Sequence, residues 1–454
     1  MNAENKHYWL KSGTFNLILN IQNLVFGFGG FYLLIRMTDK HVYGIWTLFI
    51  ATTTIFETAR NGLVQNALIK YLSASDRKEH PDIISASFVV SGLLMIACIA
   101  LNVGLAHFLA HLWNFPELTN LFYMYSIVYL LQGILLQFQW IEQAYLSFQG
   151  VLLTSIIRQG GLFTYIFYCF AFHVDVKLTN LIYAQGLSAL LGLIVEYFFI
   201  RPHMTLSRKI HWDWVKKLFN YGKFGFGTYF STMLSGTLNQ VMVGTFLSPE
   251  AAGTFNVALR ITNLADIPAN AVSVIVFPQS ARRFEQEGND APKYLYEKSV
   301  GVILAMMVPC LLFFYVFLDY VVNIIAGKTY AETIPLIKIT IITCLLNPFQ
   351  RMFGIILDSI GQPRVNFIIT ALFTVANLGL TYFFLEWYGV MGAVYATLLA
   401  DIIFFIIMQV ILRRRLRINC FNTLIYAVKI YPELYETYVK PILKRRNPFI
   451  RENK

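Results

Sequence analysis

Long apolar stretches alternate with short polar breaks along this sequence, and that alternation constrains the fold more than any other feature. A helix needs about 20 mostly apolar residues to cross the hydrocarbon core of a bilayer. Only 13% of the 454 residues are charged and 57% are hydrophobic, whereas roughly a quarter of an ordinary soluble domain is charged. The sequence therefore predicts an all-α integral membrane protein.

Twelve stretches are long enough to span, six in each half of the chain. The first six are 13–36, 42–69, 83–111, 117–145, 149–172 and 177–200, and the second six are 218–246, 250–277, 298–326, 332–358, 364–386 and 390–412. We interpret the first stretch as a retained helix, because no small-residue cleavage site follows it at signal-peptide distance.

These spans define the predicted domains. They are an N-terminal six-helix lobe at 1–200, a cytoplasmic link with an interfacial helix at 201–217, a C-terminal six-helix lobe at 218–412 and a basic cytoplasmic tail at 413–454. The tail segment 419–443 is predicted to lie on the membrane surface.

Lysine and arginine are distributed unevenly between the two sides of these spans. Most of them lie on the side of the N-terminus, and the opposite loops hold only Arg36, Lys40, Lys177 and Lys328. Basic loops face the cytoplasm, so both termini are predicted to be cytoplasmic. The net charge of +11 then reflects contact with anionic membrane lipids rather than with nucleic acid.

An internal repeat relates the two halves. Aligning Gly44 with Gly253 also aligns Glu57 with Asp266 and brings the first two spans of each half into register. Six spans per half make the repeats parallel, and transporters built from such repeats bind substrate near the bilayer midplane between them. We therefore predict two parallel six-helix lobes around a central cavity.

Charged and amide side chains inside the predicted spans are the candidate site residues. An ionised side chain at the bilayer centre costs about 2.5–3.5 kcal/mol on insertion scales, so the deep ones must face protein or water. Candidate substrate-binding residues are Arg60, Arg158, Arg260, Arg351, Asn16, Asn20, Asn23 and Asn263. The alternative is that the amides join packed helices and that Glu57 and Arg60 form a structural pair.

Several segments resemble one known family. The run "NLGLTYFFLEWYGVMGAVYATLLADII", the runs "FLSPEAAGTFNVALRI" and "VFPQSARRF", and the loop "LDSIGQP" are similar to bacterial polysaccharide flippases. These are the O-antigen and exopolysaccharide transporters of the multidrug/oligosaccharidyl-lipid/polysaccharide exporter superfamily. Asn377, Gly389, Gly392, Gly253 and Pro278 occupy characteristic positions, and the resemblance extends over essentially the whole chain.

The resemblance implies a transporter and not an enzyme. Its cargo would be a polyprenyl-pyrophosphate-linked oligosaccharide, moved by alternating access across the cell inner membrane for lipopolysaccharide or other surface glycans. The four arginines would face the pyrophosphate. Many relatives carry an aspartate where this chain has Asn239 and Gln240, so coupling to a proton or sodium gradient would fall to Glu57, Asp266 or Asp401. No other cofactor is implied, and a polysaccharide polymerase is a candidate partner.

Two alternatives stay open at this point. A multidrug or cation antiporter of the same superfamily would favour an acidic or apolar cavity, whereas the deep charges here are mainly basic. A membrane-embedded polysaccharide polymerase would need a sizeable loop outside the membrane, and the predicted outer loops are short.

Overall fold

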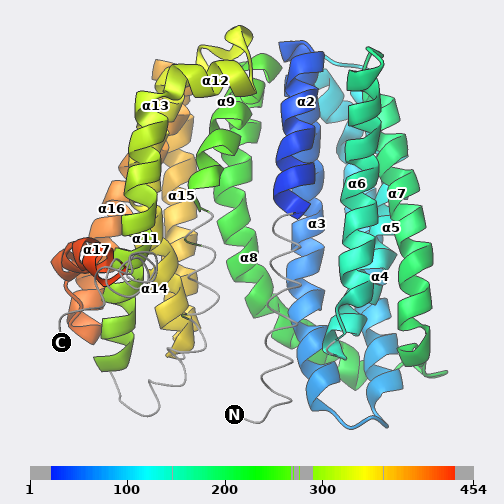
Figure 1. The fold of residues 1–454 in the computed structure, drawn as a ribbon. Coiled ribbons are helices and arrows are strands. Elements are labelled where there is room, and N and C mark those ends of the chain that lie inside the picture. The colour runs from blue at the N-terminus through cyan, green and yellow to red at the C-terminus, as the bar shows by residue number, and fades with distance from the viewer. Residues whose placement is uncertain are drawn as a thin grey trace, which may run out of the picture. The chain divides into compact units, whose positions relative to one another are not determined.

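The computed structural model describes residues 22–145, 147–266, 269, 276, 290–360 and 362–434. All regular elements in this part of the chain are helices (Figure 1). Eight of the described helices are long and apolar enough to cross a membrane, namely His80–Leu112, Leu118–Ala144, Gln149–Ala171, Leu178–His203, Ala291–Val316, Thr333–Ser359, Arg364–Tyr388 and Val390–Leu416. The prediction of an all-α integral membrane protein is confirmed.

The chain separates into two compact units, Met1–Asn256 and Val257–Lys454. We describe each by itself as unit 1 and unit 2. The lobes predicted at 1–200 and 218–412 follow from the sequence repeat, and that division stays a prediction.

Unit 1 contains helices α2 to α8 and the first part of α9. After a π-helical turn at Asn23–Phe28 come α2 (Gly29–Met37), α3 (Lys40–Ala74), α4 (His80–Leu112), α5 (Leu118–Ala144), α6 (Gln149–Ala171), α7 (Leu178–Ile200), α8 (Trp212–Phe246) and α9 (Pro249–Thr262). The helices α3, α4 and α5 pack on one another, and α7 packs on both α5 and α6.

Helix α8 packs along α3 over much of its length (Figure 1). A Cβ added to Gly222 would lie 1.9 Å from the carbonyl oxygen of Leu63, so the backbones approach more closely than a side chain permits. Gly222 is the first glycine of the run "GKFGFG", and it allows α8 to pack closely on α3. The predicted interfacial helix is part of α8, because Trp212 to Phe246 is one continuous helix.

Unit 2 contains the end of α9, a short 3-10 turn at Asn263–Asp266, and helices α11 to α17. They are α11 (Asp290–Val316), α12 (Leu318–Ile325), α13 (Thr333–Cys344), α14 (Asn347–Ser359), α15 (Pro363–Tyr388), α16 (Val390–Leu416) and α17 (Cys420–Leu434). The sequence also predicts a kink at Pro268, which lies outside the described residues.

The predicted spans 298–326 and 332–358 are each divided into two helices. The first consists of α11 and the short α12, and the second of α13 and α14. Pro348 is the second residue of α14 and has no backbone N–H to continue the hydrogen bonds of α13. A polar residue, Asn347, stands at this interruption.

The tail helix α17 packs against α11, and in Figure 1 its axis runs crosswise to those of α11 and α16. Its N-terminus is held by Glu297, whose carboxylate accepts hydrogen bonds from the backbone N–H of Asn419 at 2.9 Å and from Nδ2 of Asn422 at 3.0 Å. Phe421 and Val428 are exposed on the outer face. The described part of the predicted tail segment is thus helical, and its position on the membrane surface stays a prediction.

Candidate functional site

Arg60 is the most deeply buried of the predicted site residues whose burial the structure describes. It lies on α3 with 1% of its surface exposed, and its guanidinium faces the rings of Tyr129 at 5.5 Å and Trp140 at 5.9 Å, both on α5. The Nε and Nη2 groups donate to Oδ1 of Asn61 at 3.3 and 2.8 Å. The Nη1 group is buried without a hydrogen-bond partner. The Nη1 group of Arg60 therefore remains available as a hydrogen-bond donor to a ligand.

The space around that donor depends on a glycine. A Cβ added to Gly133 of α5 would lie 2.5 Å from Nη1 of Arg60 and 2.6 Å from Sδ of Met95. Any larger residue at this position would displace the guanidinium. Gly133 thus fixes where Nη1 can lie.

We call Arg60, Glu57 and Arg158 the polar cluster of unit 1. The hydroxyl of Tyr125 donates to Oε1 of Glu57 at 3.0 Å, and Arg158 on α6 lies within electrostatic range of the same tyrosine. The Nε of Arg158 is buried without a hydrogen-bond partner. Across the described residues, no carboxylate lies within ion-pair distance of Arg60 or Arg158. The pairing of Glu57 with Arg60 that the sequence left open is therefore not formed.

The acidic candidates of unit 2 both contact the start of α14. Asn347 donates from Nδ2 to Oδ1 of Asp266 at 3.2 Å, and Gln350 donates from Nε2 to Oδ1 of Asp401 at 2.9 Å. Asp401 is buried, with 4% of its surface exposed. The interruption between α13 and α14 therefore supplies the amides that hold both acids.

The other predicted residues are dispersed. Arg260 is exposed on α9, Asn263 is exposed in the 3-10 turn that follows, and Arg351 on α14 is half-buried. Asn23 begins the π-helical turn, and Asn16 and Asn20 lie outside the described residues. These residues remain predictions.

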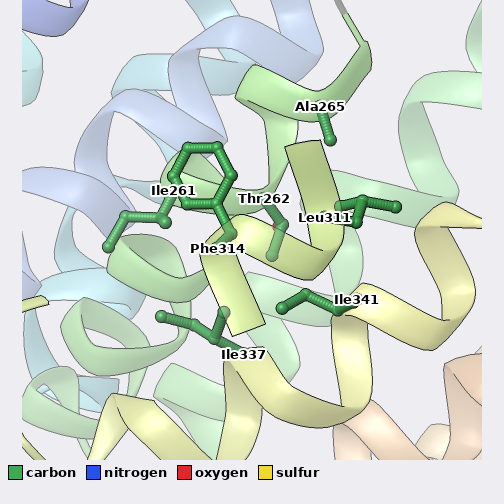
Figure 2. A pocket seen from close by; sticks show the side chains of 7 residues that line it. All are labelled: Ile261, Thr262, Ala265, Leu311, Phe314, Ile337 and Ile341. Carbon is green, nitrogen blue, oxygen red and sulfur yellow. The ribbon is translucent and has the colours of Figure 1, made fainter. Parts of the chain in front are cut away.

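A small pocket inside unit 2 is mostly apolar. Its lining consists of Ile261, Thr262, Ala265, Leu311, Phe314, Ile337 and Ile341 (Figure 2). Thr262 supplies the one polar side chain among these residues, but its hydroxyl already donates to the carbonyl of Ala258 at 2.9 Å. Such a lining suits a hydrocarbon group and not a sugar or a phosphate.

The repeat-related residues meet at the start of α3 and α9, inside unit 1. The Cα of Gly44 lies 3.3 Å from the Cβ position of Gly253, so two positions matched in the sequence alignment contact each other. The internal repeat itself stays a prediction.

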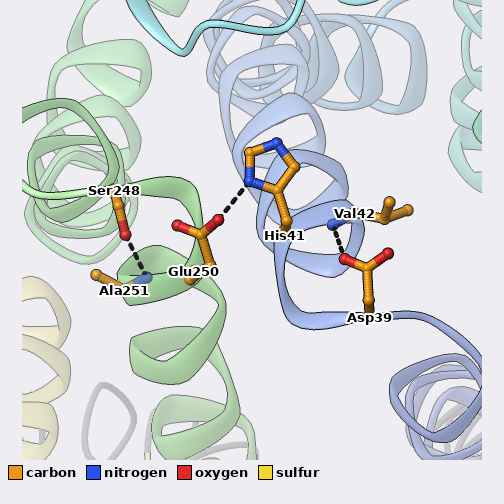
Figure 3. A network of polar contacts seen from close by, with 6 residues as sticks. All are labelled: Asp39, His41, Val42, Ser248, Glu250 and Ala251. Carbon is orange, nitrogen blue, oxygen red and sulfur yellow. Dashed lines mark hydrogen bonds and ion pairs between the residues drawn. The ribbon is translucent and has the colours of Figure 1, made fainter.

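Polar contacts flank the two glycines. His41 of α3 hydrogen-bonds through Nδ1 to Oε1 of Glu250 on α9 (Figure 3). The hydroxyl of Tyr43 donates to Oδ1 of Asn256 at 2.9 Å, and Nδ2 of Asn256 donates to Oε1 of Gln240 at 2.8 Å. The start of α9 is thereby joined to both α3 and α8.

Some of these site residues escape sequence reasoning. Tyr125 and Tyr129 stand one helical turn apart on α5 and look like ordinary buried aromatics. Their contact with Glu57 and Arg60 depends on the packing of α5 against α3. The available signal is that a deep arginine can also bind aromatic rings, so aromatic residues of neighbouring spans are candidate partners.

A helical membrane fold with buried charges held in two compact units is the architecture of a polytopic transporter. The chain belongs to the polysaccharide biosynthesis protein family, whose profile matches residues 33–335. This finding confirms the family resemblance predicted from the sequence.

Solved structures share the fold. The lipid II flippase MurJ in an inward closed conformation matches with a TM-score of 0.75 and 13% identity, over 94% of this chain and 92% of that one. An inward-facing multidrug resistance MATE transporter of the MOP superfamily matches with a TM-score of 0.71 and 15% identity, over 87% and 94%. At these identities the likeness concerns the fold alone.

Two curated relatives are archaeal. An uncharacterized membrane protein of Methanocaldococcus jannaschii is 24% identical over 71% of this chain and 64% of its own length. A probable low-salt glycan biosynthesis flippase, Agl15 of Haloferax volcanii, is 22% identical over 47% of this chain and 45% of its own length. The chain thus spans less than two thirds of the length of either relative.

Proposed function

We propose that this protein is a flippase for a polyprenyl-pyrophosphate-linked oligosaccharide. It moves this lipid from the cytoplasmic to the outer leaflet of the cell inner membrane by alternating access, in the biosynthesis of a surface polysaccharide such as O-antigen or exopolysaccharide. The observation that carries the proposal is the pair Arg60 and Arg158, each with a buried guanidinium nitrogen that lacks a hydrogen-bond partner.

Unpaired buried cations are costly. Removing the partner of a buried ion pair destabilises a protein by about 3–5 kcal/mol. Arg60, which is buried without a carboxylate partner, therefore lowers the stability of the folded protein. A pyrophosphate would relieve it, because guanidinium groups fork onto phosphate oxygens with charge-assisted hydrogen bonds. In the absence of the anion, the facing rings of Tyr129 and Trp140 hold the guanidinium of Arg60 in position.

The same observation weighs against a cation antiporter. A cationic drug would meet two guanidinium groups of its own sign, with Glu57 already engaged by Tyr125. The likeness to MATE transporters concerns the fold, so it does not favour a drug as the cargo. A lipid-linked anion fits the charges better.

The remaining candidates receive roles under this proposal. Arg260, Arg351 and the amides of Asn16, Asn20, Asn23 and Asn263 contact the pyrophosphate or the sugar. Glu57, Asp266 and Asp401 bind the coupling proton or sodium ion. Both termini face the cytoplasm, and a polysaccharide polymerase takes up the glycan on the outer side.

The test uses purified protein in liposomes with a fluorescent polyprenyl-pyrophosphate oligosaccharide, whose outer-leaflet fraction is measured with a membrane-impermeant quencher. We expect Arg60→Gln to reduce the flipping rate at least tenfold. Arg201→Gln is the matched control, because Arg201 is an exposed arginine of the same unit, and it should transport normally. Wild-type flipping in Arg60→Gln would refute the role of the arginine pair.

Arg260 provides a second test in cells. We expect Arg260→Ala to abolish surface delivery of the glycan while the protein remains inserted in the membrane, measured by surface labelling of the polysaccharide and by immunoblotting of membranes. Normal export by this variant would remove Arg260 from the substrate site.

A further inference from the structure

Two carboxyl side chains that the proposed transport site does not use lie buried together in unit 1. Glu142 on α5 is 1% exposed and Glu196 on α7 is 0% exposed, and the two carboxyl groups lie within hydrogen-bonding reach of each other. In the described part of the chain, no basic side chain forms an ion pair with either. Two carboxylates sharing one site without a cation cannot both be ionised.

The hydrogen bonds show which of the two carries the negative charge. Oε1 of Glu142 accepts from Oγ of Ser147 at 2.7 Å and from the backbone N–H of Gly150 at 3.0 Å, and Oε2 accepts from the backbone N–H of Val151 at 2.9 Å. These are free N–H groups in the first turn of α6, where the helix dipole also favours an anion. Glu142 is therefore the carboxylate that caps α6.

Gly150 is required for this arrangement. A Cβ at that position would lie 2.4 Å from Oε2 of Glu142 and 2.9 Å from Cβ of Phe199 on α7. Glycine lets the start of α6 approach both α5 and α7, so Glu142 and Glu196 can converge on it.

Glu196 has the opposite environment. Its Oε2 lies 2.9 Å from Oγ1 of Thr154, while its Oε1 is buried with no donor to accept from. Gln139 donates from Nε2 to Thr154 Oγ1 at 2.7 Å, and the same Oγ1 lies 2.7 Å from the carbonyl oxygen of Gly150. The single hydroxyl proton of Thr154 is therefore donated either to that carbonyl or to Oε2 of Glu196. An ionised Glu196 would leave Oε1 unsatisfied beside another negative charge. When Thr154 donates to Oε2, a proton on Oε1 that is donated to Glu142 satisfies every oxygen of the pair.

We propose that Glu196 and Glu142 form a proton-binding site, in which one proton is held between a carboxylic acid on α7 and a carboxylate on α5. The site is separate from Glu57, Asp266 and Asp401, and it does not depend on the proposed flippase function. Its proton fastens the end of α7 to the end of α5 and the start of α6. Losing the proton places two negative charges in one buried site and separates α7 from Glu142.

Few other titratable groups face the pair. On α6, Arg158 lies one turn beyond Thr154 on the same face, and its side chain is half-buried. Directly after α5, the ring of Tyr145 stacks on His203 with centroids 4.2 Å apart, and its hydroxyl lies 2.7 Å from Nδ1 of His80. Within the ranges that the structure describes, none of these groups forms an ion pair with Glu196.

Infrared spectroscopy of the purified full-length protein tests the proposal directly. A protonated carboxyl group has a C=O stretching band that a carboxylate lacks. We expect Glu196→Gln to remove one such band from the wild-type spectrum at neutral pH. The control, Glu386→Gln, changes an exposed glutamate on α15 and should leave that band intact. A spectrum unchanged by Glu196→Gln overturns the proposal, and so does loss of the wild-type band on adding sodium at constant pH, because a metal ion would then occupy the site.

Thermal unfolding in detergent gives a second readout. Glu196 is protonated in the folded protein and ionised in the unfolded chain, so the folded state binds more protons and its stability falls as the pH rises. The glutamine variant keeps an N–H donor to Glu142 and loses this titration. We expect the melting temperature of wild type to fall on alkalinisation more steeply than that of Glu196→Gln. Equal slopes would refute the shared proton.

Discussion

The contact between Gly44 and the start of α9 gives the sharpest structural prediction. A Cβ placed on Gly44 would lie 1.9 Å from the carbonyl oxygen of Pro249 and 2.3 Å from its carbonyl carbon. Ordinary contact begins at 3.4 Å, and both atoms belong to backbone, so no side-chain rotation can make room. Gly44→Ala must therefore push α3 and α9 apart by about 1.5 Å.

The magnitude follows from two effects. Overpacking of a well-packed contact costs about 1–3 kcal/mol. Separation also weakens the hydrogen bond from Tyr43 to Asn256, which contributes about 1 kcal/mol. We expect Gly44→Ala to lower the apparent melting temperature in detergent, followed by tryptophan fluorescence, and to reduce the flipping rate, because α3 and α9 can no longer close against each other.

The matched control is Gly104→Ala on α4. Nothing lies within 4 Å of a Cβ at Gly104, and replacing a helical glycine by alanine stabilises a helix by roughly 0.5–1 kcal/mol. The two identical substitutions should therefore shift the melting temperature in opposite directions. If Gly44→Ala melts with or above Gly104→Ala and transports at the wild-type rate, the close approach of α3 to α9 does not have the role inferred from it.

Three further substitutions test other contacts. Tyr43→Phe removes the hydroxyl that donates to Asn256 at 2.9 Å and should cost about 1 kcal/mol, measured as a smaller fall in melting temperature than Gly44→Ala produces. Glu297→Ala removes the acceptor of the Asn419 N–H, so the α17 segment should become accessible to limited proteolysis while the rest of the chain stays protected. Asp401→Asn should make flipping insensitive to collapse of the proton and sodium gradients, assayed with ionophores, and unchanged sensitivity would exclude Asp401 as the coupling acid.

Span boundaries were predictable where polar breaks are sharp. The predicted stretches 117–145, 149–172 and 177–200 differ by at most one residue at each end from α5, α6 and α7. Apolar length alone sets these helices, since the bilayer fixes how many residues they need.

Other helix boundaries depend on features that the length of an apolar stretch does not reveal. The tenth span divides at Asn347–Pro348 because proline cannot continue the hydrogen bonds of α13. Helix α8 continues through the predicted interfacial segment, because no glycine–proline break separates Trp212 from the apolar run. Whether an amphipathic stretch turns along the membrane or joins the next span is decided by packing, here against α3 and α4.

The sequence predicted which types of residue form the candidate site, but it did not predict which of these residues contact one another. A deep arginine signals function from its position in the sequence alone, and Arg60 is buried as expected. Glu142 and Glu196 carry no such signal, because each stands within a few residues of a predicted helix end, where acids are usually solvated. Their proximity arises only when α5 and α7 pack and both ends meet the start of α6.

Glu57 and Asp266, the two acids that the predicted repeat aligns, have different hydrogen-bond partners. Glu57 and Asp266 align in sequence, yet Glu57 accepts from the phenol of Tyr125 and Asp266 accepts from the amide of Asn347. In unit 1 the acid lies in a cluster with unpaired arginines, whereas in unit 2 both acids are held by amides at an interrupted helix. Both acids of unit 2 accept from amides, whereas Arg60 and Arg158 each have one buried nitrogen without a hydrogen-bond partner. Under the proposed function, this nitrogen binds an anion and the acids of unit 2 bind the coupling ion. Substitutions in the unit 1 cluster should therefore change affinity for the lipid pyrophosphate, and those at the start of α14 should change the dependence of transport on ion gradients.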